Sequence, residues 1–309
     1  MKPKDIRVAV VIPTYMRSHI LEKTIPTYFQ EYVKEVVLVA DGEQDLSKYS
    51  IIVQKLHYLA KEKGIKFNFV MLKYRVGAIR AINFGVNKIT SEYFLMSSDD
   101  IILHPNCIKT LVEKFIDLSK KEKVGAVVPK LINHDGRIVP IAPYNENIHR
   151  YISPFTGEML YDFCEKITIK ITKEIKAYFT PTLYLTKKSI FKEIGGFNEE
   201  FSFGIGFGGI GLRGEDELNT RYYKKGYSIY YIPSAIAEHL PPIKGGYRSE
   251  FIHNPFKIYL FSSLNHFKFL KYYKGGSFIF LMSVYVLKGF LALLRSYVRR
   301  KKEKSSRYT

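Results

Sequence analysis

The sequence predicts an α/β fold in which helices flank a mostly parallel β-sheet. Over the first 130 residues, short apolar runs typical of buried strands alternate with segments of helical period. Strands that alternate with helices indicate a parallel sheet covered on both faces. The 309 residues are 46% hydrophobic and 25% charged, as in an ordinary globular protein of one large or two medium domains.

The apolar runs and the segments between them give the expected elements in order. The expected strands cover residues 8–12, 36–40, 67–72, 93–97 and 125–129, and later 180–186 and 228–233. The expected helices cover residues 18–30, 46–63, 77–88 and 105–121, then a short one closed by Gly195 and Gly196, and residues 215–225. Residues 204–214 contain six glycines and predict a flexible loop, whereas 133–176 show no clear period before residue 167.

Polar residues follow three of the expected strands. The first strand leads into Pro13-Thr14-Tyr15-Met16-Arg17, the second into Asp41-Gly42, and the fourth into Ser97-Ser98-Asp99-Asp100. The carboxyl ends of parallel strands meet at one edge of the sheet, where ligands bind in such folds. Two adjacent carboxylates directly after a buried strand are costly without a counter-charge. Either these carboxylates point into water at a loop, or a cation lies at this edge.

The charge of the chain is concentrated near its end. Residues 240–309 contain 14 Lys and Arg against 2 Asp and Glu, a net charge of +12, whereas the other 239 residues carry +7 of the total of +19. Residues 256–273 form an amphipathic basic pattern, which is typical of membrane-surface helices. Residues 277–294 would span about 27 Å as a helix, just short of a bilayer core, and contain Lys288. An interfacial anchor is favoured over a membrane span, and a helical cap on the preceding domain remains open.

Two cysteines, Cys107 and Cys164, are too few for a disulfide framework or a cysteine-based zinc site. The N-terminus enters a strand pattern directly and predicts no signal peptide. Both features fit a cytoplasmic protein that associates peripherally with a membrane.

Six stretches together resemble the GT-A-fold glycosyltransferases of family 2, which are inverting enzymes that use nucleotide-sugar donors. They are VVIPTYMR at 10–17, VVLVADG at 36–42, SDD at 98–100, IGGFNEEF at 194–201, GED at 214–216 and YIPSAIAEH at 231–239. The resemblance covers about residues 6–240. It implies a catalytic domain over residues 1–242 and a basic, aromatic-rich, membrane-associated helical extension over 243–309.

The resemblance implies a divalent metal, Mn²⁺ or Mg²⁺, that neutralises the diphosphate of the donor. The family's D-x-D motif falls on Ser98-Asp99-Asp100, so Asp100 is the first candidate ligand and Asp99 the second. Ser98 replaces the first Asp and could instead hydrogen-bond the donor ribose. His239 matches an additional metal ligand of the family, and imidazole suits Mn²⁺ better than Mg²⁺.

The remaining candidates for binding the nucleotide sugar come from three loops. By the resemblance, the first loop holds the nucleotide, Asp41 contacts the base or ribose, and the loop after the third strand lines the diphosphate. The residues concerned are Pro13, Thr14, Tyr15, Arg17, Asp41, Arg75, Gly77 and Arg80. Alternatives remain open: Asp41 could serve an Asp-Gly turn, and Arg80 could be a surface arginine.

Inverting transfer needs a general base that takes the proton of the acceptor hydroxyl. The GED motif makes Asp216 the preferred candidate. Alignment on Arg221 and Gly226 instead assigns the role to Glu215. Either residue alone could also stabilise a helix N-terminus.

The sequence thus predicts a glycosyltransferase that uses a nucleotide-diphosphate sugar and an acceptor that is a sugar, lipid-linked or protein-linked. An anionic membrane surface is a further expected partner. A sugar-phosphate nucleotidyltransferase and a catalytically inactive GT-A-like binding protein are the alternatives. A nucleic-acid-binding protein is disfavoured because acidic residues follow the strands at the expected site.

Overall fold

The computed structural model describes residues 6–42, 46–144, 161–180, 183–201, 214–241, 245–246 and 268. Most of the glycine-rich segment and of the C-terminal extension lie outside this part of the chain. The predicted flexible loop and the predicted amphipathic and anchoring helices therefore lie outside the described residues.

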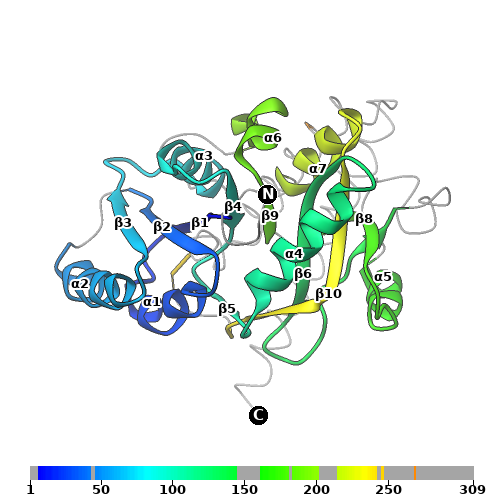
Figure 1. Ribbon diagram of the computed structural model, residues 1–309. Coiled ribbons are helices and arrows are strands. Elements are labelled where there is room, and N and C mark those ends of the chain that lie inside the picture. Colours follow the sequence, from blue (N-terminus) through cyan, green and yellow to red (C-terminus); the bar gives the residue numbers. More distant parts are fainter. Residues whose placement is uncertain are drawn as a thin grey trace, which may run out of the picture.

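The N-terminal half contains most of the expected elements in the expected order (Figure 1). They are β1 (Val8–Thr14), α1 (Ser18–Thr24), η2 (Ile25–Tyr28), β2 (Val33–Ala40), α2 (Leu46–Glu62), β3 (Lys66–Met71), α3 (Ala78–Lys88), β4 (Tyr93–Met96), β5 (Ile101–Leu103), α4 (Cys107–Ser119) and β6 (Val124–Ile132). The helix expected over 18–30 continues past Thr24 as a 3₁₀ turn with Pro26 in it, because proline cannot donate an α-helical hydrogen bond.

The second half contains both predicted elements and elements that the sequence did not predict. They are β7 (Ala142–Pro143), α5 (Tyr161–Thr168), β8 (Ile175–Phe179), β9 (Tyr184–Lys187), α6 (Lys188–Glu193), η4 (Glu199–Phe201), α7 (Gly214–Lys224) and β10 (Ser228–His239). The missed elements are β5, β7, α5 and β8, which are short or lie in the segment without a clear period.

The sheet is mixed and has a parallel core, so the expectation of a mostly parallel sheet needs correction. In the described part of the chain the strand order is β3-β2-β1-β4-β9-β6-β10-β8-β7, with β5 paired to β10. Strands β3, β2, β1 and β4 are parallel, as are β6 and β10. Strand β9 lies between β4 and β6, antiparallel to both. The alternation rule fails here because β9 follows a strand rather than a crossover helix.

Helices cover both faces of the sheet, and the alternation along β1 shows why both are apolar. Val8, Val10 and Ile12 pack on the face that α1, α2 and α4 cover. Ala9 and Val11 pack on the other face, against α3, α6 and α7. Figure 1 shows these last three helices grouped along one side of the sheet. A strand buried on both faces needs this continuous apolar sequence.

Strand β10 is longer than the predicted 228–233 and carries its last residue to the edge where β4 ends. Its end pairs antiparallel with β5, and this register sets His239 opposite Ile101. The amide of Leu240 donates a 2.8 Å hydrogen bond to the carbonyl of Asp100. The strand pairing therefore brings His239 next to Asp100, although 139 positions separate them in the sequence.

Candidate active site

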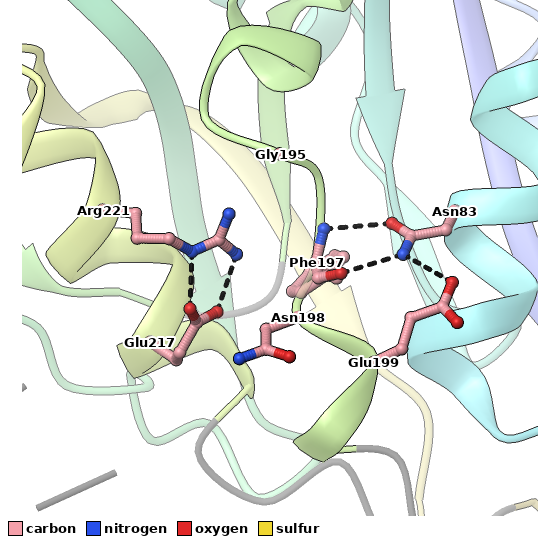
Figure 2. A pocket seen from close by; sticks show the side chains of 7 residues that line it. All are labelled: Asn83, Gly195, Phe197, Asn198, Glu199, Glu217 and Arg221. Atoms are coloured by element: carbon pink, nitrogen blue, oxygen red, sulfur yellow. Dashed lines mark hydrogen bonds and ion pairs between the residues drawn. The ribbon is translucent and has the colours of Figure 1, made fainter. Parts of the chain in front are cut away.

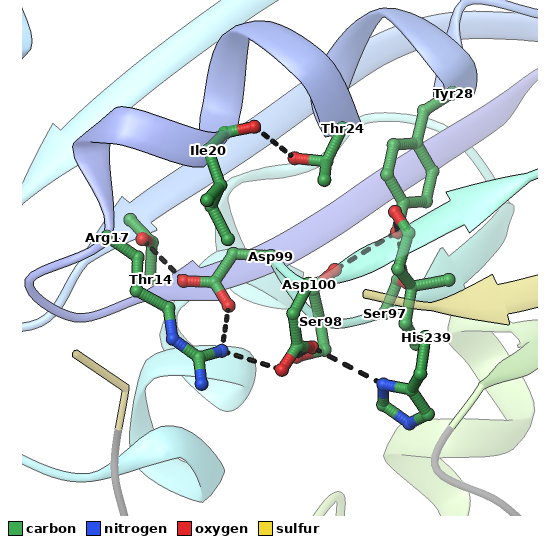
Figure 3. A network of polar contacts seen from close by, with 11 residues as sticks. Thr14, Arg17, Ile20, Thr24, Tyr28, Ser97, Ser98, Asp99, Asp100 and His239 are labelled. Atoms are coloured by element: carbon green, nitrogen blue, oxygen red, sulfur yellow. Dashed lines mark hydrogen bonds and ion pairs between the residues drawn. The ribbon is translucent and has the colours of Figure 1, made fainter. Parts of the chain in front are cut away.

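The carboxylate of Asp99 joins the ends of β1 and β4 (Figure 3). Thr14 Oγ1 donates to its Oδ2 at 2.7 Å, and Arg17 Nη1 donates to its Oδ1 at 2.9 Å. The side chain of Asp99 is buried. Both of its oxygens are therefore engaged by the loop that follows β1, and the predicted convergence of the first and fourth strands is found.

Arg17 supplies part of the expected counter-charge. Its Nη1 also lies 2.7 Å from Asp100 Oδ2, so one nitrogen bridges the two carboxylates. Only 15% of the Arg17 side chain is exposed. Its Nε is buried and has no hydrogen-bond partner among the described residues. One guanidinium and two carboxylates leave a net charge of −1 in this cluster.

Asp100 is the carboxylate that faces His239. Ser98 Oγ donates to Asp100 Oδ1 at 2.6 Å, and His239 Nδ1 lies 3.8 Å from the same oxygen. About a fifth of the Asp100 side chain and a third of the His239 side chain are exposed, at 20% and 32%. Asp100 and His239 thus expose to solvent, at the edge of the sheet, atoms that could ligate a metal, whereas Asp99 does not.

The two carboxylates have different electrostatic environments. Burial, and then the charge of Asp100, raise the pKa of Asp99 to about 6, although Arg17 and Thr14 oppose the shift. Burial would also raise the pKa of Asp100, but Arg17, His239 and the Ser98 hydrogen bond outweigh it, so this pKa is lowered. Asp100 is therefore the carboxylate that stays ionised to the lower pH.

Two buried tyrosines support this cluster, and sequence reasoning missed both. Tyr28 Oη lies 2.6 Å from Ser97 Oγ and donates to the carbonyl of Ser98 at 3.0 Å. Tyr49 hydrogen-bonds to Thr14 and to the backbone of Arg17. Each lies on an apolar helix face in the sequence, so nothing in the local pattern distinguishes it from a core residue.

Asp41 organises the loop before α3. Its carboxylate accepts hydrogen bonds from the backbone amides of Val76 (2.7 Å) and Gly77 (2.8 Å). The Arg75 guanidinium lies over the ring of Tyr15, 4.0 Å from its centroid. These contacts join the ends of β1, β2 and β3, as predicted for the carboxyl edge. The Gly77 amide, expected near phosphate, is already used by Asp41.

Glu215 and Asp216 begin α7 close to the N-terminal end of β9. Tyr184, the first residue of β9, pairs with Met96, the last residue of β4, so it lies at the same sheet edge as Asp99 and Asp100. Its hydroxyl donates to Asn219 Oδ1 at 2.9 Å. Burial raises the pKa of Tyr184 well above its usual value, and the charges of Glu215 and then Asp216 add to the shift. Both acidic residues are therefore within electrostatic reach of this edge.

Arg80 does not join the carboxylate cluster. Its Nε lies 3.3 Å from Glu199 Oε2, and Asn83 Nδ2 donates to Glu199 Oε1 at 3.1 Å. Both contacts border a polar pocket of about 440 Å³ between α3 and α7 (Figure 2). The pocket is lined by Asn83, Gly195, Phe197, Asn198, Glu199, Glu217 and Arg221.

Glu217 and Arg221 form a buried ion pair beside this pocket. Glu217 is fully buried and bonds both Nε and Nη2 of Arg221. Arg221 also donates to the carbonyls of Ile194 and Gly196. The pair thus ties α7 to the loop after α6, which is a structural role.

The described part of the chain does not contain a metal site whose ligands all come from the protein. No group of three or more His, Cys, Asp and Glu side chains is arranged there to hold an ion. At the carboxyl edge of the sheet, Asp100 and His239 approach each other to 3.8 Å. Two protein ligands fit Mg²⁺ or Mn²⁺ sites in which substrate phosphates and water complete the coordination. Within the same residues, no helix has the length and apolarity needed to cross a bilayer.

A mixed sheet with acidic residues at the carboxyl edge of its parallel core defines a GT-A-like protein, the class expected from the motifs. Residues 9–195 match the family model described as glycosyl transferase family 2. The chain belongs to this family, which confirms the predicted family and enzyme class, a glycosyltransferase.

Curated relatives are distant and have the same general description. An uncharacterized glycosyltransferase of Rickettsia conorii is 25% identical over 198 residues, which cover 62% of this chain and 28% of the relative. One of Rickettsia typhi is 21% identical over 200 residues, covering 63% and 55%. The chain therefore matches only part of the length of these relatives.

Solved structures share the fold. GalNAc-T7, solved with UDP, GalNAc and Mn²⁺, superposes with a TM-score of 0.60 at 18% identity, covering 86% of this chain and 48% of that one. The mannosyltransferase PcManGT of Pyrobaculum calidifontis, in complex with GDP-Man and Mn²⁺, gives 0.54 at 15% identity, covering 94% and 71%.

Proposed function

We propose that this protein transfers a sugar from a nucleotide-diphosphate donor to an acceptor hydroxyl, with inversion and with the help of a divalent metal. The observation that carries the proposal is the convergence of Asp100 and His239, 3.8 Å apart, at the edge of the sheet where ligands bind in this class of fold. The Mn²⁺ and nucleotide ligands of the two similar structures support the choice of cofactor and donor class.

Asp100 and His239 are the residues that would hold Mn²⁺ or Mg²⁺. When bound, the metal would act as a Lewis acid on the diphosphate leaving group. Asp99 has both oxygens engaged by Thr14 and Arg17, so in our proposal it positions the loop after β1 instead of ligating the metal. Ser98 holds Asp100 in orientation through its 2.6 Å hydrogen bond.

The nucleotide would lie along the loops that Asp41 and Tyr15 organise. The stacked pair of Arg75 and Tyr15 offers a positive charge and an aromatic face near the ends of β1 and β3. A diphosphate beside a cluster of net charge −1 would be repelled, so a divalent cation is needed to reverse the sign. This charge balance supports metal dependence.

The general base in this proposal is Glu215 or Asp216: the GED motif prefers Asp216, whereas the position on α7 favours Glu215. Residues four apart share a helix face, which sets Glu215 above Asn219, whose side chain bonds Tyr184 at the catalytic edge. Asp216 lies one position further along α7, on the helix face of Thr220. The base takes the proton of the acceptor hydroxyl while the oxygen attacks the anomeric carbon and the nucleotide diphosphate departs.

A panel of nucleotide sugars, with donor hydrolysis measured in Mn²⁺, tests the proposal. Asp100→Asn and His239→Gln should abolish metal-dependent turnover. Glu215→Gln should lower kcat by about 10²–10⁴-fold with nucleotide affinity retained, and Asp216→Asn should lower it much less. The reverse order would assign the base to Asp216. Full activity of Asp100→Asn would reject the metal assignment.

A nucleotidyltransferase would use a similar sheet and metal, and a different product separates it. Nucleoside triphosphate plus sugar phosphate should release no pyrophosphate if the proposal is correct. Pyrophosphate release without donor hydrolysis would favour the alternative. Binding of nucleotide with neither reaction would favour an inactive GT-A-like protein.

We further propose that the basic C-terminal region binds the anionic cytoplasmic face of a membrane, where a lipid-linked acceptor would be accessible. The support is its net charge of +12 over residues 240–309. Replacing Arg299, Arg300, Lys301 and Lys302 by Ser in the full chain should weaken binding to phosphatidylserine vesicles. Equal binding of the variant and the unchanged protein would reject this anchor.

A further inference from the structure

The Arg17 guanidinium is held over the carboxylates from a second side. Gly245 and Gly246, which follow the end of β10, pack against the loop after β1. The Gly246 amide donates to the carbonyl of Tyr15 at 2.8 Å. A Cβ on Gly246 would lie 2.4 Å from Cζ and from Nη2 of Arg17, so the glycine backbone rests directly on the guanidinium.

These contacts connect the end of β10 to the loop after β1 through a closed ring of neighbouring residues. It runs from His239 to Asp100, from Asp100 through Arg17 to Gly246, and Gly246 lies seven positions after His239 in the sequence. Arg17 is thus confined between the carboxylates and a backbone segment that starts at the proposed metal ligand. Its buried Nε, without a partner among the described residues, indicates that the guanidinium has not found its full set of acceptors.

We propose that Arg17 is a built-in counter-ion that competes with the divalent cation for Asp100, and that Gly245-Gly246 is the latch that holds Arg17 beside the carboxylates. The proposal rests on the assignment of Asp100 and His239 as metal ligands. Without metal, Arg17 stabilises two adjacent carboxylates that would otherwise repel each other. When a divalent cation binds Asp100, the positive charge of Arg17 opposes it, so Arg17 must release Asp100 Oδ2.

The physical reason is charge. Any cation that Asp100 held would lie close to the guanidinium that is hydrogen-bonded to the same carboxylate. Repulsion between like charges at such distances is large even with the screening of a protein surface. The latch therefore makes the metal-free protein bind cations weakly and couples cation binding to movement of Arg17 away from Asp100.

Mn²⁺ binding measured by electron paramagnetic resonance, with no nucleotide present and at pH 8, tests this directly. Arg17→Gln removes the competing charge and should tighten the Kd for Mn²⁺ at least tenfold. Gly246→Ala keeps the charge but places a Cβ 2.4 Å from the guanidinium, so the glycine backbone can no longer rest on Arg17 and the affinity for Mn²⁺ should rise as well. Gly136→Ala is the matched control, since Gly136 also has a positive φ (+82°) but has nothing within 4 Å of a Cβ.

The outcomes separate the parts of the proposal. An Arg17→Gln variant that binds Mn²⁺ no more tightly than the unchanged protein overturns the competition. If Arg17→Gln binds Mn²⁺ more tightly but Gly246→Ala binds it with unchanged affinity, the role of Gly245-Gly246 as a latch is overturned. Mn²⁺ binding that is the same with and without Asp100→Asn, tested in the Arg17→Gln background, overturns the metal assignment itself. If Arg17→Gln does not fold, Gly246→Ala against Gly136→Ala carries the test.

Discussion

Thr14 and Asp99, 85 positions apart in the sequence, are joined by a 2.7 Å hydrogen bond between a buried hydroxyl and a buried carboxylate. The bond ties the end of β1 to the end of β4 and turns the carboxylate toward the loop that carries Arg17. It explains why the two adjacent acids of this chain have different environments.

Thr14→Val should destabilise the protein by about 1.5–3 kcal/mol at pH 7, because a hydrogen bond to a buried charged group is lost. Thr14→Ser keeps the donor and should cost clearly less. Urea unfolding of both variants measures the difference. Equal stabilities for Val and Ser would mean that the hydroxyl contributes little.

The stability of the protein should depend on the ionisation of Asp99. Its pKa of about 6 in the folded state lies above the ordinary 3.8, so its contribution to stability is complete below about pH 4 and is lost as the pH rises through 6. Asp99→Asn mimics the protonated form. Apart from a fixed cost of directing its NH₂ group at Thr14 or Arg17, the free energy of unfolding of the variant relative to the unchanged protein should rise by roughly 3 kcal/mol between pH 3 and pH 7.

Urea unfolding at the two pH values, in buffer with a chelator, checks this expectation. A relative stability of the variant that does not rise between the two pH values would show that the ion pair with Arg17 outweighs the cost of burial.

Removing Arg221 should be costly because Glu217 would remain as a buried, uncompensated charge. We expect Arg221→Met to lower the free energy of unfolding by about 3–5 kcal/mol. The double variant Glu217→Met, Arg221→Met removes both charges and should lose less than Arg221→Met alone. Thermal and urea unfolding provide the comparison, and a double variant that is worse than the single one would contradict it.

Asp41→Asn should weaken the loop before α3. The carboxylate accepts two backbone amides, from Val76 and Gly77, whereas an asparagine side chain has one oxygen and would direct its NH₂ group at the other amide. A loss of about 1.5–3 kcal/mol in unfolding free energy is expected. Titration with UDP or GDP shows whether nucleotide affinity falls as well; a loss of affinity at unchanged stability would indicate direct contact with nucleotide and a lesser structural role.

The sequence predicted the family, the parallel core and the acidic edge because these depend on local patterns. Apolar runs identify strands such as β1 and β4, and motifs such as PTYMR and SDD mark the residues that follow them. The direction of β9 could not be predicted, because the sequence of a four-residue strand, Tyr184–Lys187, contains no information on its partners.

What the sequence alone determined is which side chains could do chemistry: Asp99, Asp100, Glu215, Asp216 and His239 were all named from motifs. Only the tertiary structure decided their relations. The antiparallel pairing of β10 with β5 brings His239 to Asp100, and the loop after β1 commits Asp99 to Thr14 and Arg17. The reason is physical, since hydrogen bonds and charge pairs between distant segments depend on distances that only the packed sheet fixes.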